Sequence, residues 1–315
     1  MADFPVQKID TGWIIAHRGS KNPVDPFKPY AIVREKERSC QGEIIDSGTI
    51  FLTNRECPFK CLMCDLWKNT TNERVADGVL PGQIDWGLRR MEGIRQLKLY
   101  NSGNFFDKQA IPENDYPAIF DLIRTIETVI IENHPKLTDH RCVKFRDSLN
   151  GDLEIALGLE TVHPEVLPRL NKQMDLADFE KAVRFLRHNG IRTRAFILLR
   201  PPFLNEEEGI LWAKRSVEYA FNVGVECCVL IPTRPGNGAI DSLMRDGFFE
   251  PPRIDSLEEV MEYGISLNSG RLFADLWDLD QFSRCGDCFD QRKERLERMN
   301  LFQEVIPDHH CVCAM

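Results

Sequence analysis

Residues 49–64 have the sequence TIFLTNRECPFKCLMC, and this stretch decides how the whole chain is interpreted. Its first five residues are mostly β-branched, aromatic or aliphatic, which predicts a buried strand. The polar segment that follows carries Cys57, Cys61 and Cys64 in a C-x3-C-x2-C pattern. In α/β folds, functional sites form at the carboxyl ends of the strands, so these thiols are expected in such a site.

The spacing of the three thiols suits an iron–sulfur cluster. Three thiolates this close together can hold three corners of an iron–sulfur cube and leave the fourth iron open. A four-cysteine ferredoxin would need one more nearby cysteine, and the sequence has none there. A zinc site completed by a distant ligand is the alternative. Three structural cysteines are less favoured, because the segment is polar and follows a strand.

Strand and helix patterns alternate along the middle of the chain. Five further runs predict strands, at residues 95–100, 142–146, 153–159, 193–199 and 226–231. Helices are expected over residues 116–132, after an N-cap at Asp175, and after a capping box at Asn205 and Glu208. Alternation of this kind indicates parallel βαβ units, and six units are too few for a closed eight-fold barrel.

The predicted fold is therefore α/β, a partial (β/α)6 TIM-like barrel with a small cysteine-rich C-terminal extension. The expected domains are an N-terminal extension over residues 1–46, the partial barrel over residues 47–245, and a C-terminal metal-binding extension over residues 246–315. The third region begins where the strand–helix alternation is expected to end.

Charge and composition limit the function. The 315 residues include 40 Lys or Arg and 49 Asp or Glu, for a net charge of −9, which excludes attraction of the whole molecule to a polyanion as the main source of affinity. With 43% hydrophobic and 28% charged residues, the chain is expected to fold. It lacks an apolar run of membrane-spanning length and the pattern of a signal peptide, which predicts a cytoplasmic protein with no membrane association.

Four more cysteines form a second cluster near the C-terminus. Cys285 and Cys288 form a C-x2-C pair, and Cys311 and Cys313 form a C-x-C pair. Four thiolates can close a tetrahedral zinc site, which we favour, and an auxiliary iron–sulfur cluster is the alternative. The four cysteines that remain are expected to be packing residues: Cys40, Cys142, Cys227 and Cys228.

The C-x3-C-x2-C motif after the first of six predicted βα units resembles that of the radical S-adenosylmethionine (SAM) superfamily. The resemblance implies a [4Fe-4S] cluster held by Cys57, Cys61 and Cys64, whose open iron chelates the amino and carboxylate groups of SAM. It also implies that one electron, from a donor such as flavodoxin or ferredoxin, cleaves SAM to a 5′-deoxyadenosyl radical. That radical takes a hydrogen atom from the substrate.

The same resemblance implies a set of SAM-binding residues. Residues 101–105 follow the second predicted strand, where the superfamily has a glycine-rich segment, so Ser102, Gly103 and Asn104 are expected to bind SAM. The match is loose, with one glycine rather than two and Asn in place of the usual Glu, and a plain turn is the alternative. Glu160 corresponds to a polar residue that contacts the ribose hydroxyls, with a surface strand-end glutamate as the alternative.

Two arginines are expected at the mouth of the barrel. Arg146 ends the third predicted strand and Arg200 ends the fifth, where a guanidinium could bind a carboxylate of SAM or of the substrate. Arg200 is preferred over Arg234, which follows the sixth strand. Pairing with surface acids is the alternative for all three.

A closer resemblance is to the archaeosine-synthase radical SAM family and, more distantly, to the Elp3-like group. It covers roughly residues 45–255 and implies cleavage of a C–N bond in a lysine adduct of a deazaguanine base in tRNA. The core supports the radical chemistry more strongly than the substrate. The resemblance is carried by YNSGNFFD at residues 100–107, GLET at 158–161, NK at 171–172 and LLRPPFL at 198–204, followed by Glu206.

Two alternatives to a tRNA base stay open. A small metabolite or a peptide could be the substrate, which the acidic charge and the lack of a recognisable RNA-binding domain favour. A tRNA enzyme could instead obtain its RNA affinity from a partner protein. A non-catalytic zinc-binding adaptor, which would be colourless and would not cleave SAM, is the alternative from another class.

Overall fold

The computed structural model describes residues 8–308 and residue 311. Its strands are β1 (Ala31–Arg38), β2 (Ile44–Phe51), β3 (Gln96–Tyr100), β4 (Thr128–Asn133), β5 (Asp152–Glu160), β6 (Arg192–Leu199), β7 (Cys227–Pro232) and β8 (Arg271–Ala274). Its α-helices are α1 (Thr11–His17), α2 (Val79–Leu88), α3 (Tyr116–Leu122), α4 (His140–Asp147), α5 (Val166–Arg169), α6 (Leu176–His188), α7 (Glu206–Asn222), α8 (Ala239–Arg245), α9 (Ile254–Ser266) and α10 (Phe289–Phe302). Short 3-10 segments lie at Leu66–Asn69, Glu113–Asp115, Pro135–Leu137 and Leu279–Phe282.

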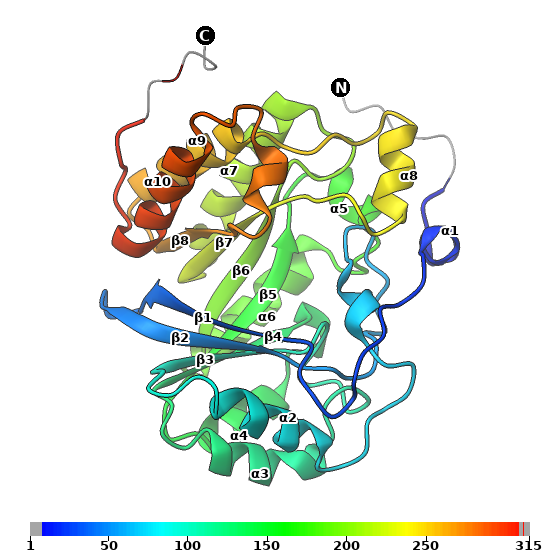
Figure 1. The fold of residues 1–315 in the computed structure, drawn as a ribbon, viewed down its shortest axis with the longest axis vertical. Coiled ribbons are helices and arrows are strands. Elements are labelled where there is room, and N and C mark those ends of the chain that lie inside the picture. The colour runs from blue at the N-terminus through cyan, green and yellow to red at the C-terminus, as the bar shows by residue number, and fades with distance from the viewer. Residues whose placement is uncertain (1–7, 309–310, 312–315) are drawn as a thin grey trace.

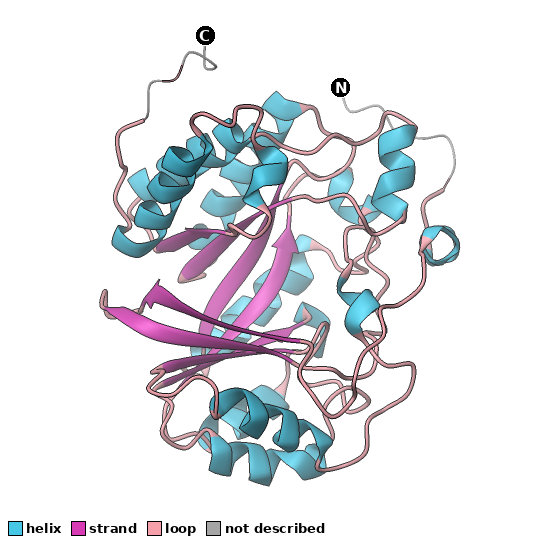
Figure 2. Cartoon of the chain, viewed as in Figure 1, coloured by secondary structure: helices cyan, strands magenta, loops and turns pink. Residues whose placement is uncertain are grey.

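The strands form one curled sheet in sequential order from β1 to β8 (Figure 1). Strand β1 is antiparallel to β2, and every later neighbouring pair is parallel. Helices α2, α3 and α4 lie outside the first half of the sheet, and α7 and α9 lie outside the second half (Figure 2). The predicted partial TIM-like barrel is confirmed.

The main hydrophobic core lies between the sheet and its outer helices. Leu97, Ile155 and Ile197 of the strands belong to one buried cluster with Val183 of α6 and Val217 of α7. The two capped helices begin as their sequences predict. The side chain of Asp175 accepts a hydrogen bond from the Asp178 amide, and that of Asn205 accepts one from the Glu208 amide.

Two element predictions are wrong, and they are close together in the sequence. The predicted helix over residues 116–132 ends at Leu122, and the run of β-branched residues from Thr128 forms β4 between β3 and β5. The predicted strand over residues 142–146 lies in α4, which Asp139 caps by accepting from the Arg141 amide. Helical spacing at Ile119, Ile123 and Ile126 masked the strand signal, and β4 is decided by its pairing with two neighbours.

The two edge strands were not predicted, because the second half of β1 is charged and β8 is only four residues long. Strand β1 has the sequence AIVREKER and comes from the predicted N-terminal extension, while β8 comes from the predicted C-terminal extension. Both belong to the same sheet as the central strands. The expected domain boundaries stay predictions. Among the described residues, no helix combines the length and the apolar character that a bilayer-spanning helix needs.

Side-chain amides in α10 and just after it cover the free edge of β8. They make the hydrogen bonds to the β8 backbone that a neighbouring strand would make. The Asn300 side chain accepts from the Ala274 amide and donates to the Ala274 carbonyl, at 2.8 and 2.9 Å. The Gln303 side chain makes the same pair of bonds with Leu272, at 2.6 and 2.8 Å. These bonds satisfy backbone groups that an open sheet edge would leave exposed.

Candidate active site

A cavity of about 700 Å³ lies inside the curled sheet, and its lining includes all three cysteines of the first motif. Its volume is that of a typical ligand pocket. Cys57, Cys61 and Cys64 lie in the loop that follows β2. The thiols therefore lie at the carboxyl ends of the parallel strands. Asn104 donates from Nδ2 to the Cys57 Sγ at 3.1 Å.

Cys61 is buried and Cys57 and Cys64 are partly buried, and this burial raises the pKa values of the three thiols. Burial raises the pKa of Cys57 and of Cys61 to about 11 and that of Cys64 to about 12, and the neighbouring thiols add to the shifts. The charge of Lys172 opposes the shift at Cys57 and Cys61. Buried thiols of this kind become thiolates when a cation binds them. The donor set therefore fits an iron–sulfur cluster with three protein ligands.

The loop after β3 approaches the cysteine loop closely. A Cβ at Gly103 would lie 3.0 Å from the Cys57 Cβ, which is tighter than ordinary packing. The amides of Asn101 and Gly103 donate to Oε1 of Glu132, at 2.7 and 3.1 Å. The Ser102 hydroxyl lies 3.1 Å from the Tyr30 hydroxyl. Ser102, Gly103 and Asn104 all line the cavity, so the structure brings the predicted segment to the cysteines.

Glu132 is a cavity residue that the sequence analysis missed, because residues 116–132 were predicted as a helix. At the end of β4, its carboxyl fixes the turn at Asn101 and Gly103. The β-branched run at residues 128–131 was the signal that could have found it.

Glu132→Gln is expected to make stability less dependent on pH. Burial raises the pKa of Glu132 from 4.5 to about 7, although the amides of Gly103, Asn101 and Ser102 oppose the shift. Because the folded-state pKa is the higher one, wild-type stability falls as the pH rises through this interval. The variant carries no ionisable carboxyl at this position. As the pH rises from about 4.5 to about 7, its urea midpoint should therefore increase relative to that of wild type. Urea unfolding of both proteins across this pH range measures the effect. A difference in urea midpoint that stays constant with pH would contradict the expectation.

Glu160 lines the cavity and forms a buried ion pair with Lys172, with Nζ and Oε1 2.7 Å apart. Burial disfavours the ammonium, but Glu160 holds the pKa of Lys172 above its ordinary value. Glu160 has a φ of +67°, in the left-handed region. Lys172 therefore fixes one oxygen of the carboxylate that the resemblance assigns to SAM.

Gly158→Ala is expected to destabilise the protein by about 1–3 kcal/mol, the usual cost of overpacking. A Cβ at this position would overlap the Glu160 carboxylate and the Lys172 ammonium. Gly82→Ala is the matched control, because Gly82 lies in α2 with no heavy atom within 4 Å of the added Cβ. Thermal unfolding compares the two variants. Equal melting temperatures would contradict the prediction, because they would show that Glu160 and Lys172 move away from the added Cβ at no cost in stability.

The two predicted arginines do not line the cavity. Arg146 lies on α4 rather than at a strand end, and its guanidinium donates to Asp147 and to the Asn189 carbonyl. Arg200 follows β6 with a φ of +50°. Its guanidinium is buried and bonds to Glu206 and Glu250, at 2.7 and 2.8 Å.

Arg234 does line the cavity, although the sequence analysis preferred Arg200. Its Nη1 lies 2.9 Å from Asp275 Oδ2.

Charged residues on the strands form the end of the cavity away from the cysteines. Arg194 of β6 donates to Glu37 of β1 and to Glu154 of β5, at 2.7 and 2.6 Å. Lys98 of β3 donates to Glu35 at 2.7 Å. Burial opposes ionisation of Glu154, but Arg194 and Arg271 bring its pKa down to about 2. Charged residues at alternate positions within predicted strands were the signal for these inward-facing groups.

The structure separates the remaining cysteines by environment. Cys285, Cys288 and Cys311 have ligand atoms within 4.8 Å of one another, while Cys313 lies outside the described residues. The packing prediction is wrong for Cys40, which is exposed at the turn between β1 and β2. It is confirmed for three buried cysteines: Cys142, which lies on α4 rather than on a strand, Cys227 and Cys228.

Comparisons with known proteins find relatives in sequence and in fold. No protein-family model matches the chain. It is 22% identical over 320 residues to an uncharacterised protein of Methanocaldococcus jannaschii, covering 94% of this chain and 88% of that protein. It is 26% identical over 166 residues to the archaeosine synthase subunit beta of Thermococcus kodakarensis, covering 50% of this chain and 51% of the relative. The chain thus matches about half of that subunit's length.

The fold has a solved counterpart in the Elp3 of Methanocaldococcus infernus. The two structures superpose with a TM-score of 0.53 at 14% identity, over 70% of this chain and 59% of that chain. The cysteine motif, the curled sheet and the sequence relatives agree with the predicted resemblance to the radical SAM superfamily, near the archaeosine synthase and Elp3 group.

Proposed function

We propose that Cys57, Cys61 and Cys64 bind a [4Fe-4S] cluster and that the chain cleaves SAM reductively. The observation that carries this proposal is that the three thiols open into the same cavity as Asn104 and Glu160. When bound, the cluster and SAM supply a 5′-deoxyadenosyl radical that abstracts hydrogen from the substrate. A flavodoxin or a ferredoxin in the cytoplasm would deliver the electron.

The protein's own residues position these groups. Asn104 donates to the Cys57 sulfur, and Glu132 holds the backbone of the segment at residues 101–103 that would face SAM. Lys172 orients Glu160, whose other carboxylate oxygen would accept from the ribose hydroxyls. The charged far end of the cavity, which includes Arg194 and Lys98, would bind polar groups of the substrate.

For the substrate, we propose a deazaguanine-type base in tRNA, with cleavage of a C–N bond. The similarity to an archaeosine synthase subunit supports this choice. The net charge of −9 favours a partner protein that supplies RNA affinity, and the relative's name as a subunit supports such a partner. A small metabolite or a peptide is the second candidate, because the cavity volume of about 700 Å³ suits a small ligand and the chain is acidic.

The substrate proposal is tested with anaerobically reconstituted protein, SAM and dithionite. Three substrates are compared: tRNA carrying a lysine adduct of a deazaguanine base, the free modified nucleoside, and unmodified tRNA. Mass spectrometry of the nucleosides is expected to show an amidine product from the modified tRNA alone. Turnover of the free nucleoside only would favour a small-molecule enzyme. Turnover of neither substrate, with the RNA-binding partner protein also present, would overturn the base assignment.

A further inference from the structure

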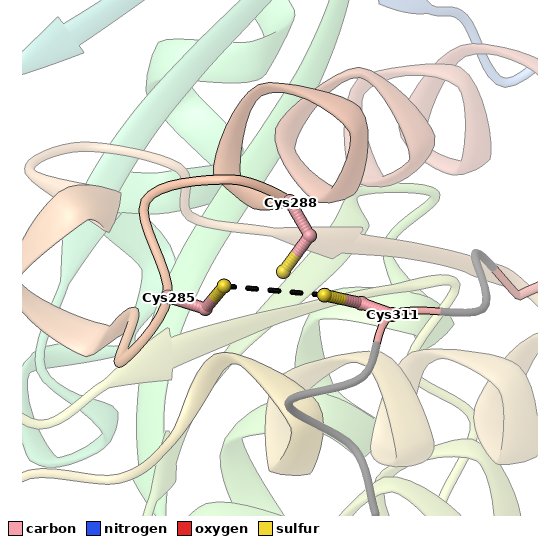
Figure 3. Close-up of side chains that lie close together, drawn as sticks. All are labelled: Cys285, Cys288 and Cys311. Carbon is pink, nitrogen blue, oxygen red and sulfur yellow. Dashed lines mark hydrogen bonds between the residues drawn. The ribbon is translucent and has the colours of Figure 1, made fainter.

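Three cysteines meet outside the active-site cavity, where the segment before α10 approaches the chain that follows it (Figure 3). Cys285 and Cys288 lie just before α10, and Cys311 lies nine residues beyond its last residue, Phe302. Figure 3 shows their sulfur atoms pointing toward one another. All three sulfurs lie within 4.8 Å of each other, and those of Cys285 and Cys311 are 3.9 Å apart.

The sulfur spacing distinguishes between the two metal sites that the sequence left open. Thiolates bound to one tetrahedral zinc at about 2.3 Å lie about 3.8 Å from each other. The 3.9 Å between Cys285 and Cys311 matches one edge of that tetrahedron. In an iron–sulfur cube each cysteine binds a different iron, so its sulfurs lie farther apart. The observed geometry therefore fits a single metal ion.

The surroundings of Cys288 suit a thiolate. Its side chain is buried at the N-terminal end of α10, where the helix dipole favours negative charge. Arg292, one turn further on, donates from Nε to the Cys288 Sγ at 3.3 Å. Arg292 also pairs with Glu258 and Asp255 of α9, so the sulfur is connected to a second helix. Partners of this kind orient metal ligands and stabilise their charge.

We propose that Cys285, Cys288 and Cys311 bind one structural zinc ion, with three thiol protons released on binding. The zinc would join the segment before α10 to the segment after it, and Asn300 of α10 and Gln303 just beyond it bond to β8. Arg295 already ties the returning segment to α10, since its Nη2 donates to the Ile306 carbonyl at 2.7 Å.

Metal analysis of the whole chain, expressed with zinc and iron available, tests this site. Wild type is expected to carry about one zinc per chain in addition to its iron. Cys285→Ser/Cys288→Ser should lose the zinc and keep the iron, and Cys40→Ser, which changes an exposed cysteine elsewhere, should keep both. Loss of iron with the double variant would show an auxiliary cluster instead. Zinc that survives in the double variant would overturn the ligand assignment.

A second measurement on wild type does not depend on how the variants fold. Cobalt(II) added to zinc-free protein should give the visible absorption of a tetrahedral thiolate site, and zinc should displace it. Chelation of the zinc should lower the melting temperature while SAM cleavage by the cluster continues. Absence of the cobalt spectrum, or a disulfide between Cys285 and Cys311 in peptide mass spectra, would contradict the proposal. The cobalt spectrum and the melting temperature do not depend on SAM cleavage, so the zinc site can fail while the proposed activity stands.

Discussion

Cys61→Ala is expected to abolish binding of the catalytic cluster and, with it, all cleavage of SAM. Two thiolates cannot hold a cube at three corners. After anaerobic reconstitution and desalting, the variant should lack the brown colour and the cluster-bound iron of wild type. Iron and sulfide analysis, with the electron paramagnetic resonance spectrum of the reduced protein, measures this loss.

Cys142→Ala is the matched control for that experiment. Cys142 is also a buried cysteine, but it lies on α4 and not among the residues that line the cavity. The control should keep full iron content and activity. A Cys61 variant that reconstitutes as well as the control would show that the first motif is not the cluster site.

Lys172→Met is expected to cost about 3–5 kcal/mol of stability, because it leaves a buried carboxylate without its partner. Lys172 and Glu160 are 10% and 8% exposed in their side chains, and their charged atoms lie 2.7 Å apart. Removal of the ammonium also takes away a positive charge that opposes the high pKa of Cys61. Urea unfolding at neutral pH, on protein without cluster, measures the change in the free energy of unfolding.

Two further variants show whether the buried pair is the cause. Glu160→Gln combined with Lys172→Met should recover most of the loss, because no unpaired charge remains. Arg184→Met breaks the exposed Glu180–Arg184 pair of α6 and should cost at most about 0.5 kcal/mol. If Lys172→Met lowers the free energy of unfolding no more than Arg184→Met does, the buried pair stabilises the protein no more than an exposed pair.

The sequence predicted five strands of the sheet, β2, β3, β5, β6 and β7, and it predicted the cysteine loop, since all of these depend on local pattern. The run at residues 49–53 and the spacing of Cys57, Cys61 and Cys64 place a strand and a ligand loop without knowledge of the rest of the fold. Ser102, Gly103 and Asn104 follow the next parallel strand, so parallel pairing alone brings them to the same edge.

Features decided by distant contacts could not be predicted in the same way. Strand β4 has helix-compatible isoleucines before it, and only its pairing with β3 and β5 makes it a strand. The side chain of Arg200 depends on Glu250, fifty residues away in sequence, which explains why it turns from the cavity. Arg194 lines the cavity because Glu37 of the unpredicted edge strand β1 neutralises it there.

Cleavage of SAM by the reconstituted wild-type chain tests the central claim most directly. With dithionite and SAM under anaerobic conditions, liquid chromatography should show 5′-deoxyadenosine and methionine from wild type and from Cys142→Ala, and none from Cys61→Ala. If wild-type protein that carries its full cluster iron forms no more 5′-deoxyadenosine than Cys61→Ala, the proposed radical SAM activity is contradicted.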